Sequence, residues 1–254
     1  MTTSMPQDRY VQVDGLRVRF WAKGEEGSAL LLIHGLGASI ETWKDNIHVL
    51  AQDHRVYALD LPGNGRSDKP PAPYSLADLA QFVREFMRVE GIERASLVGN
   101  SVGGAVSMQF AIQFPDQVDK LVLVDSAGLG KQVGLLLRLL TLPLVGEWLS
   151  RPSRKGAAQL WEEAFYDPAL VTEEWVELYY ELDSLPGNQA SMLTTLRSLA
   201  TVRGIRDEVL APILDNLVVL GDRTPDSGGN CLWRIPAAGS QPRSAGARAG
   251  KPGQ

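Results

Sequence analysis

The chain has 254 residues, of which 44% are hydrophobic and 22% charged, and its formal net charge is −5. These values are those of an ordinary globular protein, and the length suits one large α/β domain with an insertion, or two small domains. The acidic balance gives no reason to expect nucleic acid or an anionic membrane as a partner.

Three features bear on the compartment. The one cysteine, Cys231, excludes an internal disulfide and fits a reducing environment. The amino-terminal residues lack the basic start and apolar core of a secretory signal. The most hydrophobic stretch, 133–149, contains Arg138 and Glu147 and falls short of the roughly 20 apolar residues that a membrane span needs. We therefore expect a cytoplasmic protein without a membrane span, and we interpret 133–149 as a buried or lid helix.

In chain order, the first predicted element is a hairpin at residues 10–24. Apolar and polar residues alternate there on both sides of Asp14-Gly15, a dipeptide typical of tight hairpin turns. Short apolar runs, which suit strands buried on both faces, then alternate with patterns at helical spacing. The runs are 29–35, 55–60, 95–99 and 120–125, and the helical patterns lie around 41–51, 75–90 and 102–114. This alternation predicts βαβ units and a mainly parallel sheet.

The pattern changes after Asp125. Residues 130 to about 205 have apolar positions at helical spacing, which predicts an insertion of about four helices with breaks at Pro143, Pro152, Pro168 and Pro186. The leucines of this insertion suggest an apolar substrate cleft beneath it, or packing of the insertion on the core. A last strand is predicted at 216–221. From 226 to 254 neither period is present, and a composition rich in Gly, Ala, Ser, Pro and Arg predicts a disordered tail.

Residues 97–104, LVGNSVGG, contain the pattern G-x-S-x-G between a predicted strand and a predicted helix. Glycines two residues before and after Ser101 allow a sharp turn that places the serine at a helix amino terminus, where the dipole favours developing negative charge. This is the arrangement of a nucleophilic serine. We expect the oxyanion hole to consist of the backbone N–H groups of Val102 and Leu36. The loop that carries Leu36 is expected to be supported by His34, Gly35 and Gly37.

Three segments carry a resemblance to a known family: HGLG (34–37), DLPGNGRSDKP (60–70) and LVGNSVGG (97–104). In this order and spacing they resemble the α/β-hydrolase superfamily, over about residues 10–221. The resemblance implies an α/β fold with a mostly parallel sheet of about eight strands, helices on both faces and a helical cap inserted after the sixth strand. It implies a structural rather than a catalytic role for the segment that begins at Asp60. It implies no cofactor and no metal.

The resemblance also divides the chain. The first part of the hydrolase core is expected at 1–127, the cap at 128–205, the remaining core strand at 206–225 and an atypical tail at 226–254. The tail stands where the family has its last strand and helices, which are therefore missing or replaced. One hypothesis is divergence to a new tail. The other, favoured by the abrupt change of composition, is a slip of the reading frame near codons 222–226.

The catalytic partners of the serine are incomplete. The resemblance places an acid three residues after the glycine that closes the seventh strand, and a histidine base further on. That position holds Thr224, with Asp222 as a neighbouring candidate acid, and Asp125, after the sixth strand, is the alternative. All three histidines of the chain precede Ser101, so the general base is absent.

Three functions are considered on this basis. A serine nucleophile excludes the branches of the family that use aspartate. The first hypothesis is a carboxylesterase or lipase that hydrolyses a small apolar ester through an acyl-Ser101 intermediate. The second is a carbon–carbon bond hydrolase of a meta-cleavage-type dienoate, which residues 165–174 resemble. Those enzymes have an arginine where Tyr179 stands here, so Arg197 or Arg203 would have to replace it. The third is a catalytically inactive pseudo-hydrolase or truncated gene product.

Overall fold

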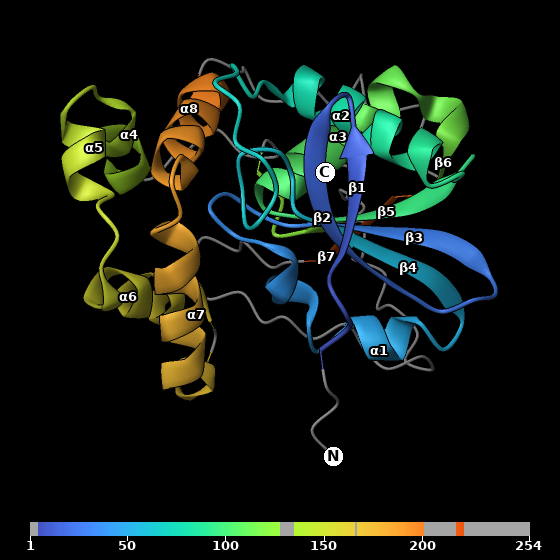
Figure 1. The fold of residues 1–254 in the computed structure, drawn as a ribbon, viewed down its shortest axis with the longest axis horizontal. Helices are drawn as coiled ribbons and strands as arrows, with labels where there is room; N and C mark the ends of the chain where they lie inside the picture. Colours follow the sequence, from blue (N-terminus) through green and yellow to red (C-terminus); the bar gives the residue numbers. More distant parts are fainter. Residues whose placement is uncertain (1–4, 128–134, 166, 201–216, 221–254) are drawn as a thin grey trace, which may run out of the picture.

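Seven strands form one sheet in the part of the chain that the computed structural model describes, namely residues 5–127, 135–165, 167–200 and 217–220. Their order across the sheet is β1-β2-β4-β3-β5-β6-β7 (Figure 1). β2 pairs antiparallel with β1 and β4, and all other neighbours are parallel, so the predicted α/β fold with a mostly parallel sheet is confirmed. The strands are β1 (Arg9–Val13), β2 (Leu16–Lys23), β3 (Ser28–Ile33), β4 (His54–Leu59), β5 (Ala95–Asn100), β6 (Val118–Val124) and β7 (Leu217–Leu220).

The sheet begins with the hairpin predicted from Asp14-Gly15. Val13 pairs with Leu16, so the turn has only two central residues. Both adopt left-handed backbone angles, with φ of 48° at Asp14 and 78° at Gly15. This is the type I′ geometry whose twist matches that of the two strands, and it fixes the register of β1 on β2.

Helices cover both faces of the sheet. α2 (Leu76–Val89) and α3 (Val102–Gln113) lie on one side, and α1 (Ile47–Leu50) lies on the other (Figure 1). Alternate residues of β3 point into the two layers, because side chains alternate along a strand. Leu31 and Ile33 belong to the cluster with α2 and α3, whereas Leu30 and Leu32 belong to the cluster with α1. β3 is therefore buried on both faces, as its apolar run predicts.

The helices of the core follow the predicted positions with one exception. α2 begins at a capping box: Ser75 Oγ accepts a hydrogen bond from the Asp78 N–H, and Asp78 Oδ2 accepts one from the Ser75 N–H. The helical pattern around 41–51 corresponds to two short elements rather than to one continuous helix. The chain there forms a 3₁₀ turn, η1 (Ile40–Trp43), and then the short α1. Glu41 is buried in an ion cluster, whereas Trp43 and Ile47 are buried in the apolar core. One straight helix would not place all three side chains in these two environments.

Between β6 and β7 the chain leaves the sheet and forms a layer of helices beside the core (Figure 1). The described part of this layer contains five α-helices rather than about four, with breaks at the predicted prolines. They are α4 (Leu135–Thr141), α5 (Val145–Leu149), α6 (Arg154–Ala164), α7 (Glu173–Asp183) and α8 (Asn188–Ala200). The 3₁₀ turn η3 (Pro168–Leu170) lies between α6 and α7, whereas η2 (Pro115–Gln117) precedes β6 and belongs to the core. All five helices fall within the expected cap.

The apolar stretch 133–149 differs from its prediction as a single buried or lid helix. Its described part consists of α4 and α5, and Leu142 and Leu144 are exposed. Packing on the core therefore does not account for these leucines. Among the described helices, none has the length and apolarity required to cross a membrane. The predicted tail 226–254 lies outside the described residues.

Candidate active site

Ser101 stands at the junction of β5 and α3, as predicted. Its φ of 49° and ψ of −115° place a non-glycine residue in a strained backbone conformation. Hydrogen bonds on both sides hold this turn. The Ser101 N–H donates to Val124 O at 3.0 Å, and Ser101 O accepts from the Ala127 N–H at 2.9 Å. The hydroxyl of a partly exposed serine is thus displayed at the carboxyl edge of the sheet.

Two glycines permit the elbow by removing side chains from backbone contacts. A Cβ on Gly103 would lie 2.2 Å from Ile33 O, and a Cβ on Gly99 would lie 2.3 Å from Gly103 O. No side chain fits at such distances from a backbone oxygen. The start of α3 can therefore approach the end of β3 closely. The glycines of the G-x-S-x-G pattern had already indicated close packing at this turn.

The loop after β3 lies directly against the serine. A Cβ on Gly35 would lie 3.3 Å from Ser101 Cβ and 2.9 Å from Asn100 Oδ1. Both donors expected for an oxyanion hole border this contact: Leu36 follows Gly35, and Val102 follows Ser101. None of the described residues accepts a hydrogen bond from the N–H of Leu36 or Val102. These donors, at a loop and at the amino terminus of α3, are available to a developing negative charge.

His34 connects two loops and is not available as a base. Its Nε2 accepts a hydrogen bond from the Leu61 N–H at 3.1 Å, and its Nδ1 donates to Gly35 O at 2.8 Å. Full burial lowers the pKa of His34 to about 4, although the bond to Gly35 and the charge of Glu41 act in the opposite direction. The ring is therefore neutral near neutral pH and joins the loop after β3 to the loop after β4.

The pH dependence of stability tests this assignment. Between about pH 6.5 and 4 the unfolded chain binds a proton at this ring that the folded protein does not, so stability falls as the pH falls through this window. The full difference is about 3 kcal/mol. We expect urea unfolding of His34→Gln to show a correspondingly flatter loss of stability on acidification than the unsubstituted chain.

The comparison between the two proteins isolates the histidine. Burial raises the pKa of Asp60 to about 6, so between about pH 4 and 6 the folded protein binds a proton at Asp60 that the unfolded chain does not. This contribution makes stability rise as the pH falls, and it is the same in His34→Gln and in the unsubstituted chain. Parallel stability curves over this range would show that His34 is not buried in its neutral form.

A buried ion cluster fixes the same two loops. Arg19 Nη2 donates to Glu41 Oε1 and to Asp8 Oδ1, both at 2.7 Å, and Arg19 Nη1 reaches Asp60 Oδ2 at 3.4 Å. The side chains of Arg19, Glu41 and Asp60 are each at most 3% exposed. Burial acts to raise the pKa of Glu41, but the hydrogen bond and charge of Arg19 hold it below its ordinary value. No motif in the sequence indicates this cluster.

Asp60 joins the cluster to the backbone of both loops. Its Oδ1 accepts from the Ile40 N–H and its Oδ2 from the Arg66 N–H, each at 2.8 Å. A Cβ on Gly65 would lie 2.2 Å from Asp60 Oδ2, so the 60–70 loop folds over the carboxylate. These contacts are structural, which is the role that the family resemblance implied for this segment.

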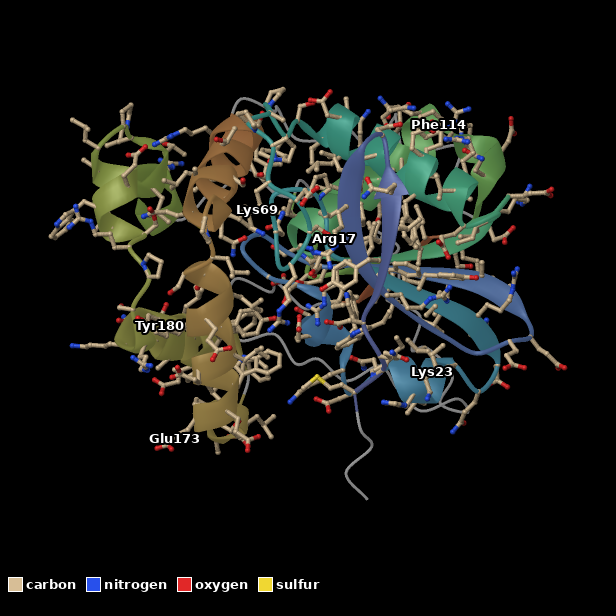
Figure 2. All side chains as sticks on the ribbon, in the orientation of Figure 1. Arg17, Lys23, Lys69, Phe114, Glu173 and Tyr180 are labelled. Carbon is tan, nitrogen blue, oxygen red and sulfur yellow. The ribbon has the colours of Figure 1, made fainter. Side chains whose placement is uncertain are left out.

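The cap contacts the core next to the serine loop. Met192 of α8 lies 3.5 Å from the position of a Cβ on Gly37. Tyr179 of α7 is 1% exposed, packs with Trp161, Trp175 and Ala38, and approaches Thr42 Oγ1 through its hydroxyl at 3.2 Å. Its neighbour Tyr180 lies on the side of α7 turned toward α6, as Figure 2 shows. Met192 and Tyr179 thus border the site through tertiary contacts that no sequence motif indicated.

Of the two candidate acids, the structure describes only Asp125. It comes directly after Val124, whose carbonyl binds the Ser101 N–H, and has a left-handed φ of 43°. Asp222 lies outside the described residues. His54 begins β4 at the opposite edge of the sheet from Ser101, since β4 and β5 are both parallel to β3. Within the described ranges, no group of three or more His, Cys, Asp or Glu could hold a metal ion.

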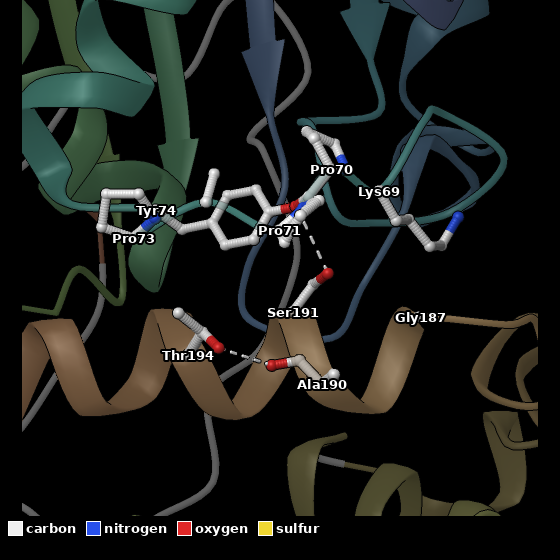
Figure 3. Close-up of a pocket in the computed structure, with 10 residues that line it drawn as sticks. Lys69, Pro70, Pro71, Pro73, Tyr74, Gly187, Ala190, Ser191 and Thr194 are labelled. Carbon is white, nitrogen blue, oxygen red and sulfur yellow. Dashed lines mark hydrogen bonds between the residues drawn. The ribbon is translucent and has the colours of Figure 1, made fainter.

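A cavity of about 480 Å³ lies between the proline-rich loop 69–74 and α8 (Figure 3). Ser191 Oγ donates to Tyr74 Oη at 3.4 Å, and Tyr74 Oη donates to Pro70 O. Lys69 Nζ is engaged by Gly65 O and Ser67 O, both at 2.8 Å. Ser101 is not among the lining residues, so this cavity is separate from the serine loop.

Comparison with known proteins agrees with this geometry. A family profile for the alpha/beta hydrolase fold matches residues 28–155, about half of the chain. The chain therefore belongs to the α/β-hydrolase fold family, whose members are generally hydrolases.

Three relatives illustrate its place in the family. An uncharacterised protein of Mycobacterium tuberculosis is 46% identical over 142 residues, which are 56% of this chain and 41% of that protein, so the chain spans about two fifths of its length. The 2-hydroxy-6-oxononadienedioate/2-hydroxy-6-oxononatrienedioate hydrolase of Burkholderia vietnamiensis is 30% identical over 93% of this chain and 87% of its own. The crystal structure of a meta-cleavage product hydrolase from Pseudomonas fluorescens superposes with a TM-score of 0.72 at 28% identity, covering 84% of this chain and 78% of that one.

Proposed function

We propose that this chain is a serine hydrolase that cleaves a small apolar ester through an acyl intermediate on Ser101. The observation that carries the proposal is the strained, partly exposed Ser101 between β5 and α3, with the Gly35 loop against it. A serine at a strained strand-to-helix turn, beside backbone N–H groups without an acceptor among the described residues, supports the assignment of a nucleophile next to an oxyanion hole.

The proposed reaction has two steps. Ser101 Oγ attacks the ester carbonyl and loses its proton, and the N–H groups of Leu36 and Val102 stabilise the oxyanion of the tetrahedral adduct. The adduct then collapses to the acyl-serine as the bond to the alcohol oxygen breaks, and the alcohol takes up a proton from solvent. Water then hydrolyses the acyl-serine. Because no histidine follows Ser101 in the 254 residues, both the hydroxyl and the attacking water lose their protons slowly to solvent. We expect residual catalysis of about 10³–10⁴ over water and an acyl intermediate that persists.

Intact-mass spectrometry after incubation with a p-nitrophenyl ester tests the proposal. We expect the mass of one acyl group on the unsubstituted chain and none on Ser101→Ala. Ser107→Ala is the matched control, because Ser107 lies on α3 but is fully buried, with its Oγ on Gly103 O at 2.8 Å. This control is expected to acylate normally. Equal labelling of Ser101→Ala would refute the nucleophile, and a folded chain without any adduct or turnover would establish the inactive pseudo-hydrolase.

A second candidate, cleavage of a carbon–carbon bond in a meta-cleavage-type dienoate, is favoured by the Burkholderia and Pseudomonas relatives. That chemistry needs a cation for the acid group of the substrate. In the described part of the cap, Tyr179 occupies the expected arginine position, and Arg197 is engaged by Glu147 at 2.7 Å and by Thr141 O at 3.1 Å. Arg203 lies outside the described residues.

Parallel assays separate the two candidates. The decay of the absorbance of a 2-hydroxy-6-oxo-2,4-dienoate is measured beside p-nitrophenyl ester hydrolysis, with Ser101→Ala as the blank for both. We expect the ester to be consumed and the dienoate to remain. Faster consumption of the dienoate would replace the first candidate by the second.

A further inference from the structure

The hairpin of α4 and α5 carries an exposed apolar surface at the end of the cap. Figure 1 shows these two helices on the far side of α8 from the sheet, at one edge of the molecule. We call this surface the cap tip. It consists of side chains that are between 37% and 83% exposed, namely Leu139, Leu142, Leu144, Val145, Trp148 and Leu149.

The opposite side of the hairpin already has its packing partner. Gly146 is buried, and a Cβ on it would lie 2.2 Å from Leu140 O and 3.3 Å from Cδ2 of Leu193, a residue of α8 that is 1% exposed. The hairpin is therefore held on α8 by one face, and the cap tip is its other face. Figure 2 shows side chains projecting outward from α4 and α5 at this edge. An apolar cluster turned away from its own packing interface is characteristic of an interaction surface.

The backbone at the corner of the hairpin is strained. Leu144 adopts a φ of 66° and a ψ of −42°, a sparsely populated combination that costs a non-glycine residue about 1–3 kcal/mol, and its side chain is 83% exposed. Among the described residues no packing of this side chain offsets the strain. Strained positions that expose a large apolar side chain are expected where the exposure itself has a function.

The charge around the cap tip indicates its partner. Residues 135–155 contain four exposed cations, Arg138, Arg151, Arg154 and Lys155, and one carboxylate, Glu147. Glu147 binds Arg197 and Arg154 binds Glu177, so Arg138, Arg151 and Lys155 are the cations of this segment without an ion pair among the described residues. The segment therefore has a net charge of +3, from four minus one, in a chain of −5. Charges on a protein surface are screened beyond about 10 Å at ordinary salt concentrations. The positive charges of this segment therefore determine which partner it attracts, and the net negative charge of the whole chain does not.

An apolar patch with unpaired cations in the same segment, at Arg138 on α4, at Arg151 after α5 and at Lys155 in the first turn of α6, fits an anionic lipid surface. The apolar side chains can enter the headgroup region while the cations meet lipid phosphates, and an exposed indole such as that of Trp148 favours this interface. A second protein chain fits less well. The patch lies at the corner of a 7-residue and a 5-residue helix, whereas stable protein interfaces bury about 1,200–2,000 Å².

We propose that the cap tip docks this protein on an anionic lipid surface, with Leu144 and Trp148 inserted and Arg151 and Lys155 against the headgroups. This docking is independent of the chemistry proposed for Ser101. It differs from the expectation drawn from net charge, which averages over the whole chain.

Co-sedimentation of the full chain with vesicles tests the proposal. Phosphatidylcholine vesicles with about one third phosphatidylserine are compared with pure phosphatidylcholine. We expect binding to the anionic vesicles that is at least about tenfold weaker for Leu144→Gln/Trp148→Gln, since two apolar side chains no longer insert. Removing two cations in Arg151→Gln/Lys155→Gln is expected to weaken binding about fivefold per charge, and only on the anionic vesicles.

The matched control is Leu160→Gln/Leu170→Gln. Both leucines are exposed, at 56% and 58%, but lie on α6 and η3 outside the cap tip, so vesicle binding is expected to be unchanged. Circular dichroism of each variant verifies folding. Absence of vesicle binding by the unsubstituted chain, or equal binding by all variants, overturns the proposal. A dimer that dissociates in Leu144→Gln/Trp148→Gln and binds no vesicles would instead assign the cap tip to self-association.

Discussion

Replacing Arg19 with methionine is expected to lower the free energy of unfolding by about 3–5 kcal/mol. Arg19 is the cation shared by Glu41 and Asp60, which are 2% and 0% exposed in their side chains. Without it, two carboxylates remain buried, and among the described ion pairs the partly exposed Arg66, at 3.2 Å from Glu41, is the cation that stays paired with one of them. Urea unfolding monitored by tryptophan fluorescence measures the difference.

Surface and compensating variants make this result specific. Arg88→Met removes an ion pair on the exterior, where Arg88 is 68% exposed and binds Glu85, and is expected to lower the free energy of unfolding far less than Arg19→Met, because solvent screens the exposed pair. Adding Glu41→Gln to Arg19→Met is expected to restore part of the loss, because one uncompensated charge is removed. If Arg19→Met costs no more than Arg88→Met, the buried cluster does not hold the loops together.

The substitution Gly103→Ala is expected to destabilise the protein by about 3 kcal/mol or more and to abolish acylation of Ser101. The new Cβ would lie 2.2 Å from Ile33 O and 2.5 Å from His34 O. Both are backbone atoms of the central strand and its loop, so neither can yield as the end of a flexible side chain would. α3 must move away from the loop that carries Leu36. Thermal unfolding and mass spectrometry of the acyl adduct measure the two effects.

Gly156→Ala is the matched control for a glycine within a helix. The nearest atom to its new Cβ is Ser153 Oγ at 2.9 Å, which belongs to an exposed side chain. Alanine is the better helix former, so a change within about 1 kcal/mol, in the stabilising direction, is expected. A Gly103→Ala protein as stable and as reactive as Gly156→Ala would contradict the close approach of α3 to β3.

The sequence predicted those parts of the fold whose signals are local. The Asp14-Gly15 turn, the four buried strands and the last strand near 217–220 were each indicated by a few adjacent residues. The helical pattern around 41–51 did not reveal that the segment is divided into η1 and α1. Glu41 is buried in the ion cluster and Trp43 in the apolar core, and periodicity does not distinguish these two environments. The leucines of α4 and α5 were expected to be lid or core residues because they are hydrophobic. Hydrophobicity alone does not indicate whether a given face of a helix packs against the rest of the protein or is exposed.

The sequence by itself determined the family, the order of strands and helices and the position of Ser101 between a strand and a helix, because each depends on short-range patterns. Only the tertiary structure decided that His34 is a neutral link between loops, that Arg19, Glu41 and Asp60 form one buried cluster, and that α7 and α8 border the serine loop. Contacts such as Arg19–Glu41 and Gly37–Met192 join residues that are 22 and 155 positions apart. Burial and charge at such distances depend on how the layers pack, and no local pattern encodes that arrangement.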